Sequence, residues 1–300
     1  MTNRLLQLAV KAVPATMALS LSTSAFACAS CGCTLSSDWE SQGFTSQTGL
    51  KMDIRYDYLN QDQLRAGTGK ISSARAALRT TGSGDPQEVE KYTKNQYLTL
   101  GLDYAVSQDW GVNLQIPYID RKHNTLGLNS DGHSPADEAY VSKTSSLGDI
   151  KLIGRYQGFT PQHNFGVMFG LKFATGSHTK TGTSTDPAAL GDTAEIDRGL
   201  QPGTGTTDAI LGAYYFDALS KNWDYFTQAI AQIAMNSSDH YKPGTGYNLN
   251  VGIRYLGIEN IVPQLQLNSR YVKHDTGANA DVGSTGGTLT RAKRRCPLIG

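Results

Sequence analysis

Apolar and polar residues alternate along this chain in stretches of about ten residues, a period typical of β-strands. Between Leu50 and Tyr58 every even-numbered residue is apolar or aromatic, and every odd-numbered residue is charged. A period of two places these two sets on opposite faces of a strand. A strand that crosses a bilayer at a tilt needs about 9–11 residues, so this stretch is long enough. The pattern predicts a membrane-spanning strand with one face toward lipid and the other toward water.

Similar stretches predict further strands, and the connections between them alternate in length. The expected strands cover approximately 50–59, 96–106, 112–118, 149–156, 165–173, 207–216, 224–235, 247–255 and 261–271. The long connections are 60–95, 121–148, 174–206, 236–245 and 272–287, and the short ones are 107–109, 157–163, 217–223 and 256–260. Outer-membrane barrels have short periplasmic turns and long extracellular loops, whereas a soluble β-sandwich has no reason to keep this order. The sequence therefore predicts an all-β fold, a transmembrane antiparallel β-barrel of about 10–12 strands.

Three local features refine this prediction. Pro117 has no N–H to donate, so pairing is expected to loosen near that end of its strand. The strands at 207–216 and 224–235 alternate too weakly for their faces to be assigned. The loop at 174–206, rich in Gly and Thr, is expected to fold inward as a constriction.

The two ends of the chain differ from the barrel segment, which we place at 49–287. Residues 1–27 resemble a secretory signal peptide, with Arg4 near the start and an Ala25-Phe26-Ala27 cleavage site. Residues 28–48 form a polar leader, so we expect a periplasmic N-terminus and an outer-membrane location in a Gram-negative bacterium. The tail at 288–300 has no alternation and no terminal aromatic residue. An odd number of expected strands suggests that closing strands are missing through truncation or a frameshift, with a basic lipid-binding tail as the alternative.

Composition excludes several classes of protein. The hydrophobic fraction of 39% and the mean hydropathy of −0.36 exclude a bundle of apolar transmembrane helices. A formal net charge of +1 argues against nucleic-acid binding, which calls for a clear basic surplus. There is no G-x-S-x-G motif, and Ser177 beside His178 on a flexible loop is not a catalytic triad, so no enzymatic activity is expected.

The water-facing sides of the expected strands define the predicted lining of a pore. Cations gather on the later strands and acids on the first two, an arrangement that would favour polar or anionic solutes. Alternatively, these charges simply pair and fill a narrow barrel. The predicted lining residues are Lys51, Asp53, Arg55, Asp57, Asp103, Lys151, Arg155, Lys172, Asn248, Asn250, Arg254, Gln264, Gln266 and Arg270.

Cysteines and histidines supply the candidate metal ligands. Cys28, Cys31 and Cys33 have a C-x-x-C-x-C spacing that suits a soft metal ion such as Cu(I) or zinc, but an oxidised pair is the expected state in the periplasm. The alternative is that they have no role. Haem attachment would need a histidine after the second cysteine, which is absent. No resident cofactor is therefore expected. His123, His133, His178, His240 and His274 fall in the expected outer loops, and His163 falls in an inner turn. Facing loops could gather the five into a metal site, but polar loops collect histidines without any role, which is the favoured interpretation.

Two short motifs carry a family resemblance. The segments Ser146-Leu147-Gly148-Asp149-Ile150 and Gly199-Leu200-Gln201-Pro202-Gly203-Thr204-Gly205-Thr206-Thr207-Asp208 resemble the outer-membrane transporter family named after the meta-cleavage pathway of phenol degradation. The resemblance covers about residues 95–270. It implies a barrel that admits small, often hydrophobic, organic molecules.

The sequence thus predicts an outer-membrane β-barrel channel for passive passage of small molecules, with membrane lipid and a small-molecule solute as partners. One alternative is a structural barrel that contacts a periplasmic redox or metal-handling protein through the cysteine leader. Another is surface adhesion through the long loops.

Overall fold

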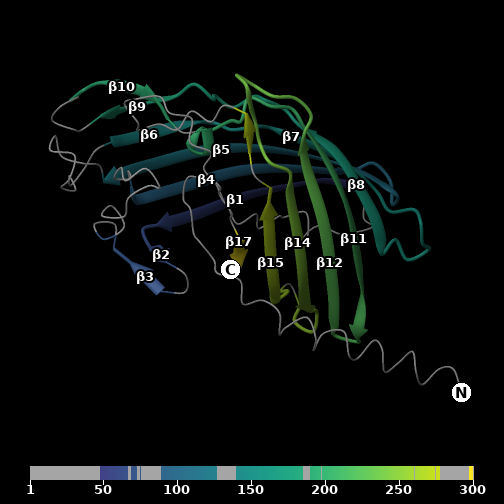
Figure 1. Ribbon diagram of the computed structural model, residues 1–300. Helices are drawn as coiled ribbons and strands as arrows, with labels where there is room; N and C mark the ends of the chain where they lie inside the picture. Colours follow the sequence, from purple (N-terminus) through teal and green to yellow (C-terminus); the bar gives the residue numbers. More distant parts are fainter. Residues whose placement is uncertain are drawn as a thin grey trace, which may run out of the picture.

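The computed structural model describes residues 48–66, 69–72, 75, 89–126, 140–184, 190–196, 198–259, 261–273, 275–277 and 297–299. Its main element is one antiparallel β-sheet that curls into an open half-barrel (Figure 1). In this part of the chain, no helix is long and apolar enough to cross a membrane. The prediction of an all-β antiparallel fold without closure is confirmed.

The long strands of the sheet follow one another in space almost as they do in sequence. They are β1 (Gly49–Gln61), β4 (Val89–Ala105), β5 (Trp110–Leu126), β6 (Tyr140–Leu147), β7 (Lys151–Tyr156), β8 (Phe165–Lys172), β11 (Asp208–Ser220), β12 (Trp223–Ala234), β14 (Gly246–Tyr255) and β15 (Gln264–Val272). Two short strands, β9 (Thr181–Ser184) and β10 (Thr193–Glu195), extend the sheet beside β6, and β17 (Pro297–Ile299) pairs with β15. Two separate hairpins pair β2 (Leu64–Ala66) with β3 (Gly69–Ile71) and β13 (Tyr241–Lys242) with β16 (Thr276–Gly277). A short 3-10 helix, η3, covers Arg198–Leu200.

The expected loop at 121–148 is wrong, because much of that segment is strand. Strand β5 continues to Leu126, and β6 pairs with it over Tyr140–Leu147. Strand β4 likewise begins at Val89, before its expected start. These extensions are rich in Lys, Asn, Ser and Thr, so the sequence carries no apolar alternation there. Backbone pairing and polar side-chain contacts, such as the hydrogen bond between Thr93 and His123, build this part of the sheet.

Pro117 marks a change of partner on β5. On the N-terminal side of Pro117, Trp110–Gln115 pairs with β7, and on its C-terminal side Tyr118–Thr125 pairs with β6. Proline has no N–H for a ladder hydrogen bond, and its carbonyl accepts one from Gly148 N at 2.8 Å. The predicted loosening at Pro117 therefore takes the form of a break between two strands, while pairing with β4 continues on the other side.

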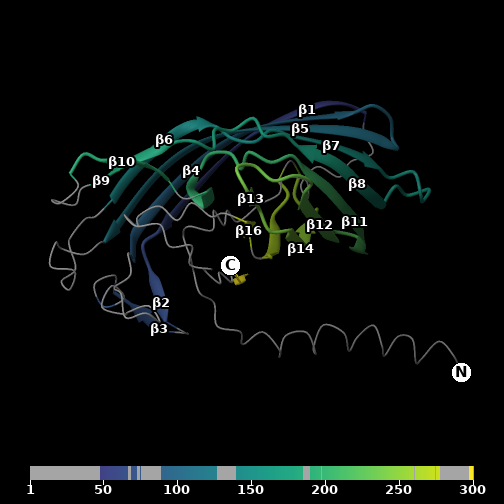
Figure 2. The same cartoon turned by 45° about the horizontal axis from the view of Figure 1, so that its top comes forward.

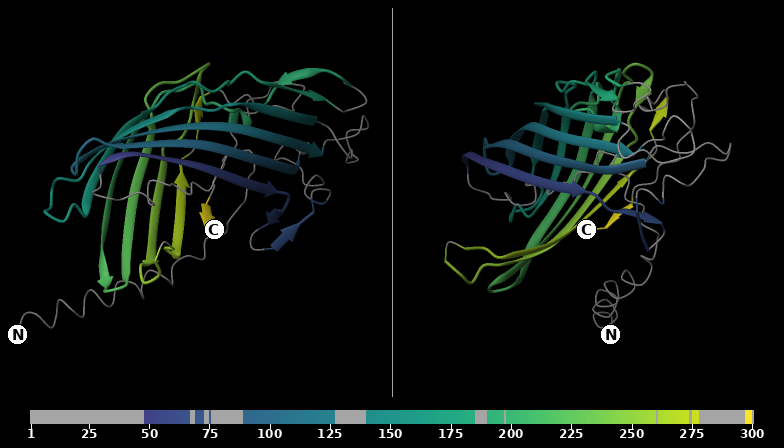
Figure 3. Two further views of the ribbon diagram at one scale, coloured as in Figure 1. Left: turned by 180° about the vertical axis from the view of Figure 1, so that it is seen from behind. Right: turned by 90° about the vertical axis from the view of Figure 1, so that its left-hand side faces the viewer.

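The two outer edges of the sheet lie well apart (Figure 3). Among the described residues β1 pairs only with β4, so its other edge is open. Strands alternate in direction from β1 to β15 when β6 and β7 count as one interrupted strand, so β1 and β15 run the same way. An antiparallel closure therefore needs a strand between them, and β17 occupies the first three positions of such a strand.

The sheet has two chemically different faces. The outward face exposes apolar side chains, among them Leu50, Met52 and Ile54 with exposed fractions of 68%, 66% and 69%. The concave face lies inside the curve that Figure 2 shows. On that face Asp103 and Asn113 are only 1% and 5% exposed. A water-soluble sheet would bury its apolar face, whereas this one exposes it.

Candidate functional site

The register of the sheet places all the predicted lining residues on the concave face. Residues directly opposite one another in antiparallel neighbours share a face. One such row runs Asp53, Gly101, Gln115, Lys151, Lys172, Asp208, and another runs Gly111, Arg155, Met168, Gly212, Ile230, Asn248, Arg270. Parallel rows hold the remainder of the set: Lys51, Arg55, Asp57, Asp103, Asn250, Arg254, Gln264 and Gln266. Their role as the lining of a pore stays a prediction.

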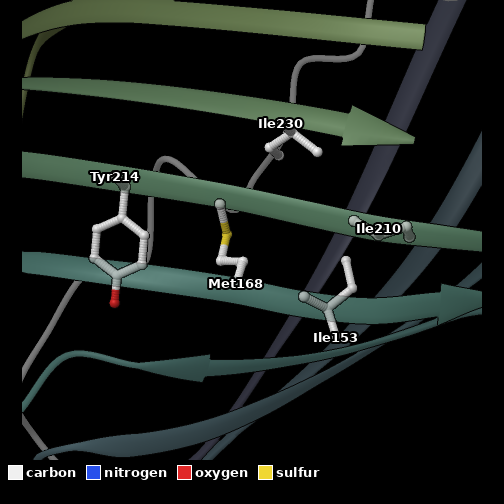
Figure 4. Close-up of a cluster of buried hydrophobic side chains, with 5 residues drawn as sticks. All are labelled: Ile153, Met168, Ile210, Tyr214 and Ile230. Carbon is white, nitrogen blue, oxygen red and sulfur yellow. The ribbon is translucent and has the colours of Figure 1, made fainter. Parts of the chain in front are cut away.

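The concave face also carries an apolar cluster that the sequence did not reveal. Its members come from β7, β8, β11 and β12 and are Ile153, Met168, Ile210, Tyr214 and Ile230 (Figure 4). Strand β11 is apolar on both faces, since Leu211 and Ala213 alternate with Ile210 and Tyr214. A period-two pattern is therefore invisible in this strand, and only the register with β8 and β12 assigns the faces.

Glycines let large side chains lie flat against the concave face. A Cβ atom on Gly166 would stand 2.3 Å from Cζ of Tyr214, and one on Gly252 would stand 2.4 Å from Cζ of Phe226. Both distances are so short that a residue with a Cβ atom could replace either glycine only by displacing the ring. The phenol of Tyr214 also donates to Oε1 of Gln157 at 2.7 Å, which fixes the ring along the sheet. The rings therefore cover the sheet and do not project away from it.

The charged side chains of the concave face pair locally. Arg155 binds Asp103, and Arg254 binds Asp224 through two hydrogen bonds of 2.9 and 2.6 Å. Arg55 binds Asp57, two residues along the same strand, at 2.8 Å. These three ion pairs agree with the alternative that the charges pair. Asp224 was missed because the face of its strand could not be assigned from the sequence.

The two resemblance motifs meet in one buried polar network around Lys172. The ammonium of Lys172 lies 3.0 Å from Oδ2 of Asp149 and 3.1 Å from Oδ2 of Asp208, and it also donates to Thr204. Asp149 belongs to the first motif, and Thr204 and Asp208 belong to the second. Asp149 further accepts from the backbone N–H of Thr204 at 2.9 Å and of Gly176 at 3.0 Å. The motifs therefore attach the segment at 198–206 to the end of β8.

A buried arginine holds the same segment against β5. Arg121, 4% exposed, donates from Nη1 to the carbonyl of Gly199 at 3.2 Å and from Nη2 to the hydroxyl of Tyr97 at 2.9 Å. Leu200 of the segment forms a small apolar core with Ile196, which precedes it. The expected inward fold of the loop at 174–206 is thus present at 198–206, which lies against the concave face, whereas β9 and β10 of the same loop extend the sheet beside β6.

Two long loops contact each other at η3. Arg198 donates to the carboxylate of Asp239 and lies with its guanidinium 5.7 Å from the ring centre of Tyr241. His178 Nε2 lies 3.4 Å from Oδ2 of the same aspartate. The hydrogen bond from Arg198 lowers the pKa of Asp239 below its usual value, so the carboxylate is charged at neutral pH. This ion pair links the loop after β8 to the loop after β12.

The remaining candidate ligands do not converge in the described residues. His123 lies on β5, buried and hydrogen-bonded to Thr93 at 2.7 Å, so its expected place in an outer loop is wrong. His178 and His240 lie in the long loops. His163 lies in a short turn, with its Nε2 2.9 Å from Oδ1 of Asp109. His133 and His274 lie outside the described residues. In the described ranges no group of three His, Cys, Asp or Glu side chains is placed to hold a metal ion. Cys28, Cys31 and Cys33 lie outside those ranges, as does 288–300 apart from β17, so a metal or disulfide there stays a prediction.

No family model and no curated protein matches the chain, so the family resemblance stays a prediction. Among solved structures, the COG4313 outer membrane channel from Pseudomonas putida F1 is 14% identical, with 77% of this chain and 75% of that chain covered and a TM-score of 0.48. The CymD monoaromatic hydrocarbon channel is 12% identical, with 76% and 82% covered and a TM-score of 0.35.

Proposed function

We propose that this chain is an outer-membrane β-barrel channel for passive passage of small molecules, with its long loops outside the cell. The single observation that carries the proposal is the exposed apolar face opposite a polar concave face. Exposed apolar side chains on a sheet of this size need a nonpolar solvent, and a bilayer supplies one. A curled sheet with this polarity encloses water when it closes.

The dimensions of the outward face support a membrane location. Trp110 packs against Tyr156 with ring centres 4.7 Å apart near the short turns, and Tyr118 lies further along β5. The outward residues between them on β5 are Val112, Leu114 and Ile116. Eight residues of strand cover about 26 Å, or about 20 Å along the barrel axis at the usual tilt, close to the apolar band of about 25 Å in such barrels. The aromatic residues would then lie at the two interfaces.

The concave face supports passage of small molecules over passage of large ones. The segment at 198–206 lies against this face and is held at both ends, by Arg121 and by the network of Lys172. A loop fixed in this way narrows the space that the sheet encloses. The charges pair locally. The apolar cluster around Met168 and Tyr214 therefore has neutral amides, such as that of Asn250, as its neighbours on the concave face. No observation among the described residues favours the alternative of a redox partner.

Conductance of the protein in planar lipid bilayers tests this function, and two neighbouring residues of β15 provide a matched pair of variants. Gln266 lies on the concave face, whereas Leu265 lies on the outward face with an exposed fraction of 72%. Tryptophan at Gln266 is expected to reduce single-channel conductance severalfold, because the ring enters the passage. The same change at Leu265 is expected to leave conductance unchanged. Absence of any conductance in the parent, or equal effects of the two variants, would contradict the proposal.

A further inference from the structure

Three lysines form a row across neighbouring strands on the outward face. Lys94 of β4 lies directly opposite Lys122 of β5, and Lys122 lies directly opposite Lys143 of β6. All three side chains are exposed. Directly opposite residues in a sheet have Cβ atoms about 4.5–5.5 Å apart, so three ammonium groups share a small area.

The row lies just beyond the apolar part of the outward face. The last apolar row on these strands is Leu98, Tyr118, Leu147, and a polar row of Gln96, Asp120, Ser145 follows it. The hydroxyl of Tyr118 is 2.9 Å from Oγ of Ser145, so the phenol is directed toward the polar side. Lys122 is four residues past Tyr118, about 13 Å along the strand and about 9 Å along the membrane normal at a 45° tilt.

This height matches the headgroup layer of a membrane. The polar interface of each leaflet is about 5–7 Å thick, and lysine side chains reach back toward it by snorkelling. The row therefore places three cations beside lipid headgroups, provided that the outward face contacts lipid as proposed above.

Like charges directly opposite one another destabilise a sheet. The nearest carboxylates are Asp120, one polar row below Lys122, and Asp62, which accepts a hydrogen bond from Asn60 directly opposite Lys94, so two negative charges face three positive ones. Lys94 lies 5.2 Å from the ring centre of Tyr92, a contact that offsets part of the cost for one lysine. Three lysines placed in this way are stabilised when an external anion neutralises their positive charge.

We propose that Lys94, Lys122 and Lys143 bind the phosphate group of a lipid headgroup in the leaflet on the side of the long loops. The ligand is an amphiphile because only one polar row separates the lysines from the apolar strip of Leu98, Tyr118 and Leu147, where an acyl chain would lie. A phosphate suits the row because its several oxygens accept hydrogen bonds from more than one ammonium group. Free phosphate would gain nothing from the apolar strip.

Spin-labelled lipids in vesicles of phosphatidylcholine test this proposal on the full chain. We expect the parent protein to prefer labelled phosphatidic acid over labelled phosphatidylcholine in its boundary layer. In the variant Lys94→Gln, Lys122→Gln, Lys143→Gln this preference should fall by about fivefold for each lysine removed, as expected for cations at an anionic surface. The matched control replaces Lys70, Lys221 and Lys242, which are also exposed but lie in the β2–β3 hairpin, a short turn and the β13–β16 hairpin, and should keep the preference.

A second measurement covers the case in which the triple variant folds poorly. Lys122→Gln alone removes the central charge, so it should raise resistance to guanidinium chloride in pure phosphatidylcholine and lower it when phosphatidic acid is present. Equal preference of parent and triple variant, or suppression of the preference by inorganic phosphate at the same concentration as the lipid, would overturn the lipid site while leaving the channel intact. A protein that conducts no ions yet keeps the preference would instead contradict the proposed function alone. Failure of the chain to enter vesicles would contradict both.

Discussion

Replacing Lys172 by methionine is expected to lower the free energy of unfolding by about 3–5 kcal/mol. The side chain is 4% exposed and lies between the carboxylates of Asp149 and Asp208, so its removal leaves two buried negative charges close together. Guanidinium chloride unfolding of the protein in lipid vesicles measures the change. Faster hydrogen exchange at 198–206 should accompany it, because Thr204 attaches that segment to the same network.

Lys151 provides the control for this prediction. It lies directly opposite Lys172 on β7 and on the same face, but it is only half-buried. Lys151→Met is expected to cost less than about 1 kcal/mol, as for exposed ion pairs. Neutralising Asp149 and Asp208 by asparagine in the Lys172→Met background should recover part of the loss. Equal costs for the two lysines would show that the buried network does not stabilise the fold.

Arginine in place of Val251 is expected to reduce the free energy of unfolding by about 2–4 kcal/mol. Val251 lies in the middle of β14 on the outward face, with an exposed fraction of 44%. At a valine exposed to water this substitution changes the free energy of unfolding by no more than about 0.5 kcal/mol, whereas the centre of a bilayer strongly disfavours a guanidinium. Unfolding from vesicles of phosphatidylcholine measures the difference.

Leu256 is a matched position for the second prediction because its exposed fraction, 49%, is similar. It follows the end of β14 at the short-turn side of the sheet, where the bilayer interface is expected. Leu256→Arg should therefore cost only about 0–1 kcal/mol. A small cost at both positions would mean that the outward face does not contact lipid.

The sequence predicted the sheet well where one face is apolar and the other is polar. In β1 and β14 the alternation is strict, so the faces and approximate bounds follow directly from the residues. In β6 the residues between Val141 and Leu147 are polar on both faces, and the strand pairs through its backbone with β5, a contact that no local pattern records. In β11 both faces are apolar, and the inner cluster was missed for that reason.

The candidate site was less predictable because its contacts join distant parts of the chain. The residues around Lys172 come from positions as far apart as Asp149 and Asp208, and Arg121 meets the carbonyl of Gly199 across 78 residues. The pairing of Arg254 with Asp224 required the face of β12, which the sequence left open. Spacing predicts which residues share a face, whereas pairing between strands decides which of their charges meet.

The central claim is that the outward face contacts lipid and the concave face contacts water. A nitroxide scan of positions 248–251, 253 and 254 of β14 tests it most directly, after serine has replaced Cys28, Cys31, Cys33 and Cys296 in vesicle-reconstituted protein. Labels at 249, 251 and 253 should collide more with oxygen, which concentrates in lipid, and labels at 248, 250 and 254 more with a water-soluble nickel complex. Collision profiles without this two-residue alternation, or with all six positions accessible to the nickel complex, would contradict the account.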